Sequence, residues 1–431
     1  MSNPTTDRDG PAAPEQVGVL ATWREMPRPA KALLAGVFVS KLAGFIQIFL
    51  VLFLTARGFS SGQAGFGLGM YGAGAILGTF VGGSLSDRQS ARTAMLTSML
   101  GSAALLVSIV YLKNYYLLLL AIVLVSAVSQ VYRPAAQAMI TELTPGTRLV
   151  MVTAIYRLCL NLGTSAAPLL GVALVSVSYN LLFWGEALAA VIYCLIALFF
   201  LPRGRPKPSP AANHGDAAVE PPRKPRSGYL EMFGDHRYML FLLGFLFLHL
   251  VYIQYTAVLP LAVTDAGLST WWYAAAITIN GALIVACEVW ATKFVQHWSL
   301  RLSQGAGYAL LAAGYAAYSI GMTPALLVIG TLLWTLSEIV GAPTVWAYPG
   351  LVAPSHLRGR YYGGLHSTYG LGSTIGPIIG IALFASVGQR FFLYATAVGV
   401  LATIVGQLGI RTPETEPAAE PAVAEALADA P

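Results

Sequence analysis

The chain has 431 residues, of which 56% are hydrophobic and only 10% are charged. Soluble domains carry roughly 25% charged residues, so this chain cannot cover the surface of a soluble globular fold. Its apolar residues form long runs such as 181–201, and a helix that crosses a bilayer needs about 20 mostly apolar residues. The composition therefore predicts an all-α membrane protein. The formal charge of +6 does not indicate a nucleic-acid partner, because the basic residues are concentrated in particular loops between the apolar runs.

Apolar segments separated by charged residues, Pro or Gly predict twelve transmembrane helices. In chain order they cover residues 31–55, 63–85, 93–112, 116–140, 150–176, 180–201, 238–262, 271–293, 302–321, 325–349, 361–386 and 391–410. We expect two six-helix bundles, 31–201 and 238–410, with an N-terminal tail (1–30), a linker (202–237) and a C-terminal tail (411–431).

The linker is rich in Pro and basic residues and lacks apolar periodicity, which predicts a flexible connection. A short amphipathic surface helix near Tyr229–Phe233 is the alternative. The two ends, 1–22 and 412–431, are biased toward Ala, Pro and Glu and are expected to be disordered.

The placement of Lys and Arg predicts the orientation in the membrane, because cytoplasmic loops carry an excess of both. With the N-terminus inside, the cytoplasmic segments hold nineteen basic residues and the outer loops hold three, which are Arg57, Lys113 and Arg390. We therefore expect both termini and the linker on the cytoplasmic side.

When the sequence is shifted by 209 residues against itself, residues that bend or end helices in the first half align with the same residue types in the second half. The matched pairs are Pro134 with Pro343, Pro145 with Pro354, Pro168 with Pro377, Gly163 with Gly372, Gly171 with Gly380, and Arg92 with Arg301. Three prolines at one offset predict a duplicated six-helix unit in parallel repeat. Such repeats, with a binding site between them at the middle of the membrane, are typical of transporters.

The loop after the second helix contains Gly83, Asp87, Arg88 and Arg92, and it resembles the loop signature of the major facilitator superfamily. Ser90 and Ala91 stand where that family usually has Gly and Arg. The resemblance implies a cytoplasmic gate formed by these charges, with Asp87 beside the positive N-terminal end of a neighbouring helix. In an outward-facing state we expect this end to be the one near residues 361–364.

The fifth predicted helix carries Gly163, Pro168 and Gly171, which resemble the glycine-rich motif of the superfamily's proton-driven exporters. The eleventh repeats the pattern around Gly376-Pro377. We expect these small residues to let each helix pack closely on its neighbour from the other half, and generic helix packing is the alternative. The stretches 132–140 and 337–343 also resemble bacterial drug-efflux facilitators, and the similarity covers roughly residues 30–410.

Three carboxylates lie well inside the predicted spans, where a charge costs about 2.5–3.5 kcal/mol on insertion scales. Glu338 is the leading candidate for a proton-carrying group, because its helix lines the central cavity in the family that the chain resembles. Glu288 is the next choice, although it is expected to pair with Lys293. Glu186 is expected to reach the headgroup water from the outer end of its helix.

Three cations lie at the same depths. Lys41 is expected to bind an anionic group of the substrate or to act as the counter-charge of Glu338. Arg133 and Arg157 are expected to hold the cytoplasmic gate. Three aromatic side chains and one amide on the seventh and tenth predicted helices are expected to line the substrate cavity. They are Tyr252, Gln254, Tyr255 and Trp334. Packing alone is the alternative for each of them.

The resemblance implies a monomeric secondary transporter in the bacterial inner membrane that moves a small amphiphilic compound by alternating access, with export in exchange for protons. The alternative is proton-coupled transport of a zwitterion such as a short peptide. An enzyme is not expected, because the sequence offers no catalytic constellation, metal-ligand spacing or phosphate-binding loop, and no cofactor is implied.

Overall fold

The computed structural model describes residues 19–203 and 228–411, and these residues form helices and connecting turns without any strand. Ten segments of this part are long and apolar enough to cross a membrane, and one of them, Ser355–Gly409, covers the last two predicted spans. Helix α15 (Leu300–Ile320) is not one of these ten segments; it has the same length as α5 (Ala91–Tyr111), which is one of them, but carries more Gly and Tyr. Each of the twelve predicted spans coincides with a helix or with a run of consecutive helices, and the predicted all-α membrane fold is confirmed.

The first bundle packs around one apolar core. Its helices are α2 (Arg28–Leu42), α3 (Phe45–Ala56), α4 (Ser61–Arg88), α5, α6 (Tyr115–Gln130), α7 (Tyr132–Leu143), α8 (Leu149–Val175) and α9 (Asn180–Phe200). The first predicted span is broken at Ala43-Gly44 into α2 and α3, because the chain there leaves helical geometry. The ends of these two half-helices therefore lie inside the bundle.

The second bundle is built in the same order of helices. It contains α11 (His236–Tyr252), α12 (Gln254–Ala257), α13 (Leu259–Asp265), α14 (Thr270–Val295), α15, α16 (Pro324–Val352), α17 (Arg358–Val387) and α18 (Phe391–Gly409). Short 3-10 turns precede or follow some helices, namely η1 (Gly146–Arg148), η3 (Ser355–Leu357) and η4 (Gly388–Arg390).

Helix boundaries repeat at the offset of 209 residues that the sequence predicts. Helices α5 and α15 start at Ala91 and Leu300, and in each the serine just before the first residue accepts a backbone N–H three residues on. Helices α8 and α17 start at Leu149 and Arg358. Two half-chains with the same local start signals thus fold into the same series of helices.

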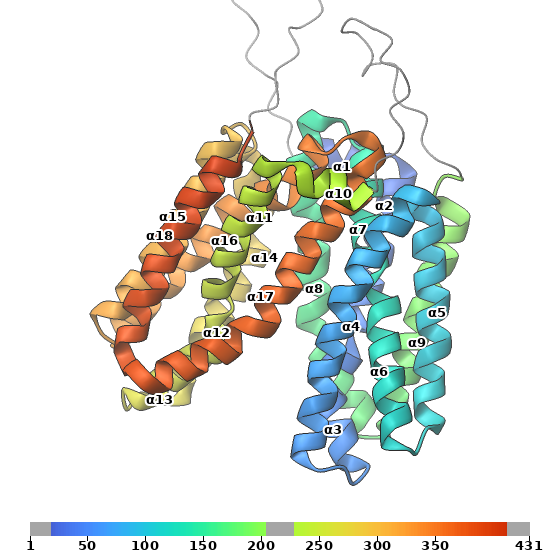
Figure 1. Ribbon diagram of the computed structural model, residues 1–431, viewed down its shortest axis with the longest axis horizontal. Helices are drawn as coiled ribbons and strands as arrows, with labels where there is room; N and C mark the ends of the chain where they lie inside the picture. Colours follow the sequence, from blue (N-terminus) through green and yellow to red (C-terminus); the bar gives the residue numbers. More distant parts are fainter. Residues whose placement is uncertain (1–18, 204–227, 412–431) are drawn as a thin grey trace, which may run out of the picture.

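Both α8 and α17 begin at the end of the molecule that carries two short helices, α1 (Val19–Glu25) and α10 (Gly228–Gly234), which we call the α10 end (Figure 1). The equivalent helices of the two halves therefore run in the same direction, as a parallel repeat requires. Helix α10 lies where the alternative surface helix was considered, and α1 includes residues 19–22, which were expected to be disordered. Residues 1–18, 204–227 and 412–431 of the predicted tails and linker lie outside the described residues.

The motif glycines of the two proline-containing helices, α8 and α17, pack against their own bundle, which corrects one expectation. A Cβ on Gly163 would lie 2.7 Å from the Cβ of Lys41, and one on Gly372 would lie 2.8 Å from the ring of His249. Lys41 is on α2 and His249 is on α11, in the same halves as their glycines. The motif glycines therefore bring each of these helices close to the first helix of its own half, while other glycines of α17, such as Gly363 and Gly370, face α4 of the other half.

Candidate functional site

A cavity of about 470 Å³ lies between the two bundles. The first bundle lines it with three cations from α2, α7 and α8, which are Lys41, Arg133 and Arg157. The second bundle lines it with Glu338 of α16 and with several aromatic rings of α11, α12, α16 and α17. The cavity is thus a polar and aromatic chamber at the interface of the two halves, with room for a small organic molecule.

An ion cluster forms the cavity wall between α8 of the first bundle and α14 and α16 of the second. Nε of Arg157 donates to Oε1 of Glu288 at 2.5 Å, and a terminal nitrogen of the same guanidinium lies 3.8 Å from Oε2 of Glu338. The Glu288 side chain is fully buried, whereas those of Arg157 and Glu338 are 13% and 12% exposed. Nδ2 of Asn280 lies 3.5 Å from Oε1 of Glu338. One cation of the first bundle is therefore shared by two carboxylates of the second.

This cluster corrects three sequence-based expectations. Glu288 pairs with Arg157 instead of Lys293, because Lys293 lies five residues further along α14 and side chains on one helix meet at spacings of three or four. The ammonium of Lys293 instead lies 5.9 Å from the ring centre of Phe294. Glu338 lies nearest Arg157 rather than Lys41, and Arg157 lies in the cavity wall rather than only at the gate.

The two other cations line the cavity without an ion pair. Among the described residues, no carboxylate lies within 4.0 Å of Lys41 or of Arg133. Arg133 was expected at the gate, and the structure places it on the cavity wall together with Lys41. The wall that the first bundle contributes is therefore positive, and it faces the side that holds Glu338.

Of the three aromatic side chains and one amide predicted to line the cavity, two reach it and two do not. Tyr252 and Tyr255 line it. Trp334 is buried behind them, since its ring stacks on Tyr255 at 5.2 Å and its Nε1 donates to the hydroxyl of Tyr318 at 3.0 Å. Gln254 turns away at the break between α11 and α12, where its amide donates to the backbone carbonyls of Leu250 and Gly376 at 2.8 Å. Trp334 and Gln254 support the cavity wall from behind.

Asp87 joins the two bundles at the α10 end. Its carboxylate accepts the backbone N–H groups of Gly359 and Arg360 at 2.7 and 3.0 Å, and the guanidinium of Arg360 lies 3.1 Å away. The contact is at the N-terminal end of α17, as the sequence predicts, although it begins two residues before 361–364. An anion is favourable there because the first N–H groups of a helix have no partner within it.

Further hydrogen bonds between the bundles lie near the same end. Thr79 of α4 contacts Ser367 of α17 at 2.7 Å between their hydroxyl oxygens. Two residues of α7 also contact α17, because Thr141 and Gln137 lie 2.8 Å from Tyr362 and His366, respectively. In Figure 1 the bundles meet at this end and diverge toward the opposite one. The cavity is thus closed on the side of the α10 end.

Arg92, near the start of α5, bonds within its own bundle in the contacts that the structure gives. Arg92 donates to the backbone carbonyls of Ala197 and Leu198 at 3.2 and 2.7 Å, at the C-terminal end of α9 in its own bundle. Arg301 reaches the carbonyl of Ile410 at 3.4 Å in the equivalent place of the other half. Arg88 is exposed at the end of α4. Arg92 therefore fastens helices within a bundle, where a cation is favourable beside terminal carbonyls.

Sequence reasoning placed Glu186 at the membrane surface, and the structure places it in the interior of the first bundle. Its Oε2 accepts the backbone N–H of Ile46 at 2.8 Å, at the start of α3. Reasoning from the sequence also missed Asn280 beside Glu338. The available signal was its polar side chain in the middle of an apolar span, two helical turns before Glu288.

Comparisons with known proteins agree with this geometry. The family model of the Major Facilitator Superfamily matches residues 33–365. The chain is 28% identical over 330 residues to the uncharacterized MFS-type transporter YhjO of Bacillus subtilis, covering 75% of this chain and 78% of that one. It is 26% identical over 323 residues to the multidrug resistance protein MdtH of Shigella dysenteriae, covering 72% and 74%.

Solved structures show the same fold. The transporter FucP in its outward conformation superposes with a TM-score of 0.69 at 16% identity, covering 89% of this chain and 99% of that one. The human organic anion transporter MFSD10 gives a TM-score of 0.64 at 18% identity, covering 88% and 98%. The matched family model spans most of the membrane helices, and the chain belongs to the Major Facilitator Superfamily as a multi-pass secondary transporter rather than an enzyme.

Proposed function

We propose that the protein exports a small amphiphilic compound in exchange for protons across the bacterial cytoplasmic membrane, with the α10 end and both termini in the cytoplasm. The observation that carries this proposal is the sharing of Arg157 of one bundle by Glu288 and Glu338 of the other. A proton on Glu338 would remove one of the two negative charges that attract Arg157 across the bundle interface. Proton binding would thus change the force between the two halves.

This effect of protonating Glu338 is consistent with exchange of substrate for protons. The cluster lies between bundles that are joined toward the α10 end, so the open side of the cavity would face the periplasm. A proton arriving from that side would neutralise Glu338 and weaken the attraction between the bundles. The cytoplasmic side could then open, take up substrate and release the proton. A ligand or proton can shift such an equilibrium only by its difference in affinity for the two states.

The aromatic wall supports an amphiphilic substrate, because rings such as Tyr252 and Tyr255 favour flat apolar bodies and carry polar edges. The likeness to MdtH, which is named for multidrug resistance, supports the same class. A zwitterionic solute is the second candidate. It is favoured by Lys41 and Arg133 on one side of the cavity and Glu338 on the other, since a molecule with two opposite charges would satisfy both sides.

The test is transport by the purified protein in proteoliposomes with an imposed pH gradient. The panel would contain fluorescent cationic and neutral amphiphiles, and short peptides as zwitterions. For the substrate that moves, Glu338→Gln should abolish transport driven by the pH gradient but retain exchange of labelled for unlabelled substrate. Lys293→Gln, which changes a charge outside the cluster, should leave both unchanged. Normal gradient-driven transport by Glu338→Gln would reject Glu338 as the coupling group.

A further inference from the structure

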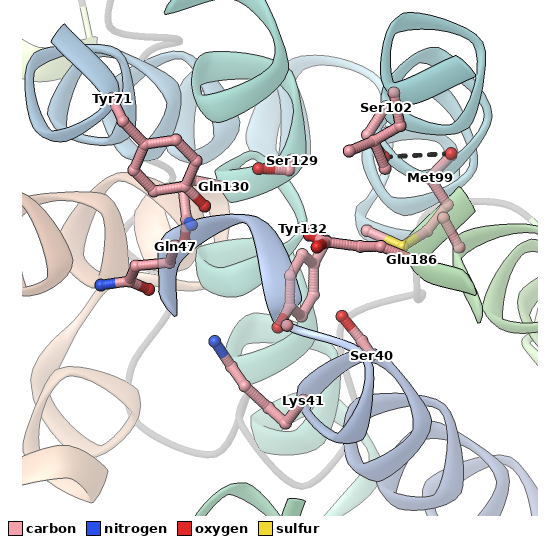
Figure 2. A pocket seen from close by; sticks show the side chains of 13 residues that line it. Ser40, Lys41, Gln47, Tyr71, Met99, Ser102, Ser129, Gln130, Tyr132 and Glu186 are labelled. Carbon is pink, nitrogen blue, oxygen red and sulfur yellow. Dashed lines mark hydrogen bonds between the residues drawn. The ribbon is translucent and has the colours of Figure 1, made fainter. Parts of the chain in front are cut away.

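A second cavity of about 50 Å³ lies inside the first bundle. It is lined by α2, α3, α4, α5, α6, α7 and α9, so it belongs to one half of the transporter and not to the interface (Figure 2). A buried water molecule needs a cavity of roughly 10–15 Å³ on this measure, so there is space for more than one. We call this space the inner cavity. Lys41 lines both the inner cavity and the central cavity.

Glu186 of α9 brings a carboxylate to this space. It accepts the N–H of Ile46, which the break at Ala43-Gly44 leaves without a backbone partner in a preceding turn of helix. The carboxylate thus replaces a missing turn of helix and also faces a chamber that can hold water. A carboxyl group with access to water can exchange protons, whereas one sealed among apolar side chains cannot.

The side chain of Gln130 indicates that the inner cavity offers a hydrogen-bonding position to water. Gln130 of α6 lines it and is only 8% exposed, and its Oε1 has no hydrogen-bond partner in the structure. Because a buried acceptor without a partner is costly, a donor such as water is expected beside it. Figure 2 shows Lys41 extending into the same space, on the side that Gln47 and Tyr132 line.

The charges around Glu186 are few. The groups near it that can ionise are Lys41 on α2, Tyr71 on α4, and Tyr132 and Arg133 on α7. Helices α5 and α6 contribute only neutral lining residues, which are Met99, Ser102, Leu106, Ser129 and Gln130. Among the described residues, Lys41 forms no ion pair within 4.0 Å, so its ammonium is not fixed to the carboxylate.

We propose that Glu186 is a second proton-binding carboxyl group, reached through water in the inner cavity, and that Lys41 couples its protonation to the central cavity. When an anionic group binds in the central cavity, the ammonium of Lys41 turns toward it and away from Glu186. The carboxylate then binds a proton that comes from the bulk solvent and is relayed by the water of the inner cavity, and it becomes a neutral acid, while Lys41 keeps its charge. The proton thus replaces the positive charge that Lys41 withdraws from the inner cavity, and the anionic group compensates the ammonium in the central cavity.

This inference rests on the proposed function and adds a proton site of opposite sign to it: a substrate with an anionic group favours a proton on Glu186, whereas substrate uptake releases the proton of Glu338. It differs from the Glu338 site in place, because Glu186 lies within one bundle and Glu338 lies at the interface between bundles. The two sites are therefore separable by experiment. A measurement that needs neither substrate nor transport isolates the Glu186 site.

The test is infrared difference spectroscopy of the purified full-length protein between successive pH values, with the proton itself as the probe. The wild type should give a band of a protonated carboxyl group that is absent from Glu186→Gln and still present in Glu338→Gln. The glutamine keeps an acceptor for the N–H of Ile46, which favours folding. If this variant does not fold, Glu186→Asp supplies the assignment, because it keeps the carboxyl group but should shift the band.

The proposed coupling between Lys41 and Glu186 is tested by a separate variant. In Lys41→Met the Glu186 band should persist to higher pH, with proton affinity raised about tenfold or more, because the nearby ammonium that favours the carboxylate is gone. Absence of any pH-dependent band that depends on residue 186 would overturn the second site, whatever the transport assays of Glu338→Gln give. A band that does not respond to Lys41→Met would overturn the coupling.

Discussion

Arg157 can occupy the membrane interior because two carboxylates of the other bundle compensate its charge. An ionised side chain there must be paired or hydrated, since its desolvation costs several kcal/mol. Glu288 is fully buried and its second oxygen, Oε2, has no hydrogen-bond partner in the structure, so it depends on Arg157 for compensation. Glu338 is slightly exposed to the cavity and has a weaker contact, which leaves it better placed to gain and lose a proton.

Arg157→Gln should therefore destabilise the protein strongly, by about 3–5 kcal/mol, because Glu288 would keep a buried charge without a partner. The double variant Arg157→Gln/Glu288→Gln should recover much of this loss. Thermal unfolding in detergent measures both, with Lys293→Gln as the control expected to change little. If Lys293→Gln destabilised the protein as much as Arg157→Gln, the pairing with Arg157 would be wrong.

The sequence identifies which residues carry charge in the membrane but not their partners. A count along the spans finds Arg157, Glu288 and Glu338, because each interrupts an apolar run. Their pairing depends on how α8, α14 and α16 are rotated and on their depth relative to one another, which no local pattern encodes. Glu186 was misplaced for the same reason. Gln254 was misplaced because the break after Tyr252 changes the direction in which the next side chains point.

At the scale of helices, the positions at which equivalent helices of the two halves begin could be predicted from the sequence. Pro145 and Pro354 each precede a 3-10 turn that leads into a long helix. Proline fixes the local backbone and serine caps helix starts. Because both effects act over only a few residues, they can be recognised from one sequence alone. The partner of each helix is a property of packing. That is why the glycine motifs were assigned to the wrong neighbour.

Close backbone contact between α15 and α16 gives a test of this packing. A Cβ on Gly307 would lie 2.6 Å from the Cα of Gly341, closer than real contacts allow, so Gly307→Val should destabilise by roughly 1–3 kcal/mol or more. Gly281→Val in α14 is the matched control, because a Cβ there meets nothing within 4 Å. Both changes have the same intrinsic cost in a helix. Equal unfolding temperatures for the two variants would contradict the contact.

Asp87 at the start of α17 gives a second test at this scale. Asp87→Asn removes the charge that faces the helix N-terminus and Arg360, an interaction worth up to about 2 kcal/mol in partly buried settings. The state closed at the α10 end should lose population by roughly tenfold, which corresponds to about 1.4 kcal/mol. Distances between spin labels at the exposed positions 89 and 356 measure the shift.

Arg92→Gln is the control for Asp87→Asn, because Arg92 bonds only within its own bundle in the contacts given above. It should lower stability modestly but leave the distance distribution between the labels in place. If both variants shifted the distribution alike, the effect of Asp87 would reflect general loosening of the fold and not the loss of a contact between bundles.

At the scale of the whole molecule, the hydrogen bonds and ion pairs that the structure gives between the described parts of the two bundles lie at or toward one end. Asp87, Thr141 and Thr79 contact α17 there, and the Arg157 cluster lies at the closed side of the cavity. Inside each bundle, glycines allow neighbouring helices to pack closely. Each half can therefore move as a rigid unit, and the contacts between the halves are those that must break for the cavity to open at the α10 end.

A disulfide across the closed end should consequently stop transport. Thr79→Cys/Ser367→Cys places two thiols where the hydroxyl oxygens lie 2.7 Å apart on α4 and α17, in a background in which Cys159, Cys194 and Cys287 are replaced by Ala. Oxidation should abolish substrate exchange in proteoliposomes, and reduction should restore it, because the cavity can then open at the α10 end again.

The matched control is Ser303→Cys/Thr344→Cys, whose hydroxyl oxygens lie 2.8 Å apart on α15 and α16 of one bundle. That bond ties together helices that move as one unit, so oxidation should leave exchange intact. Non-reducing gels establish that each pair has formed its bond. Continued exchange by the fully oxidised Thr79–Ser367 pair would mean that the two bundles do not separate between α4 and α17 during transport.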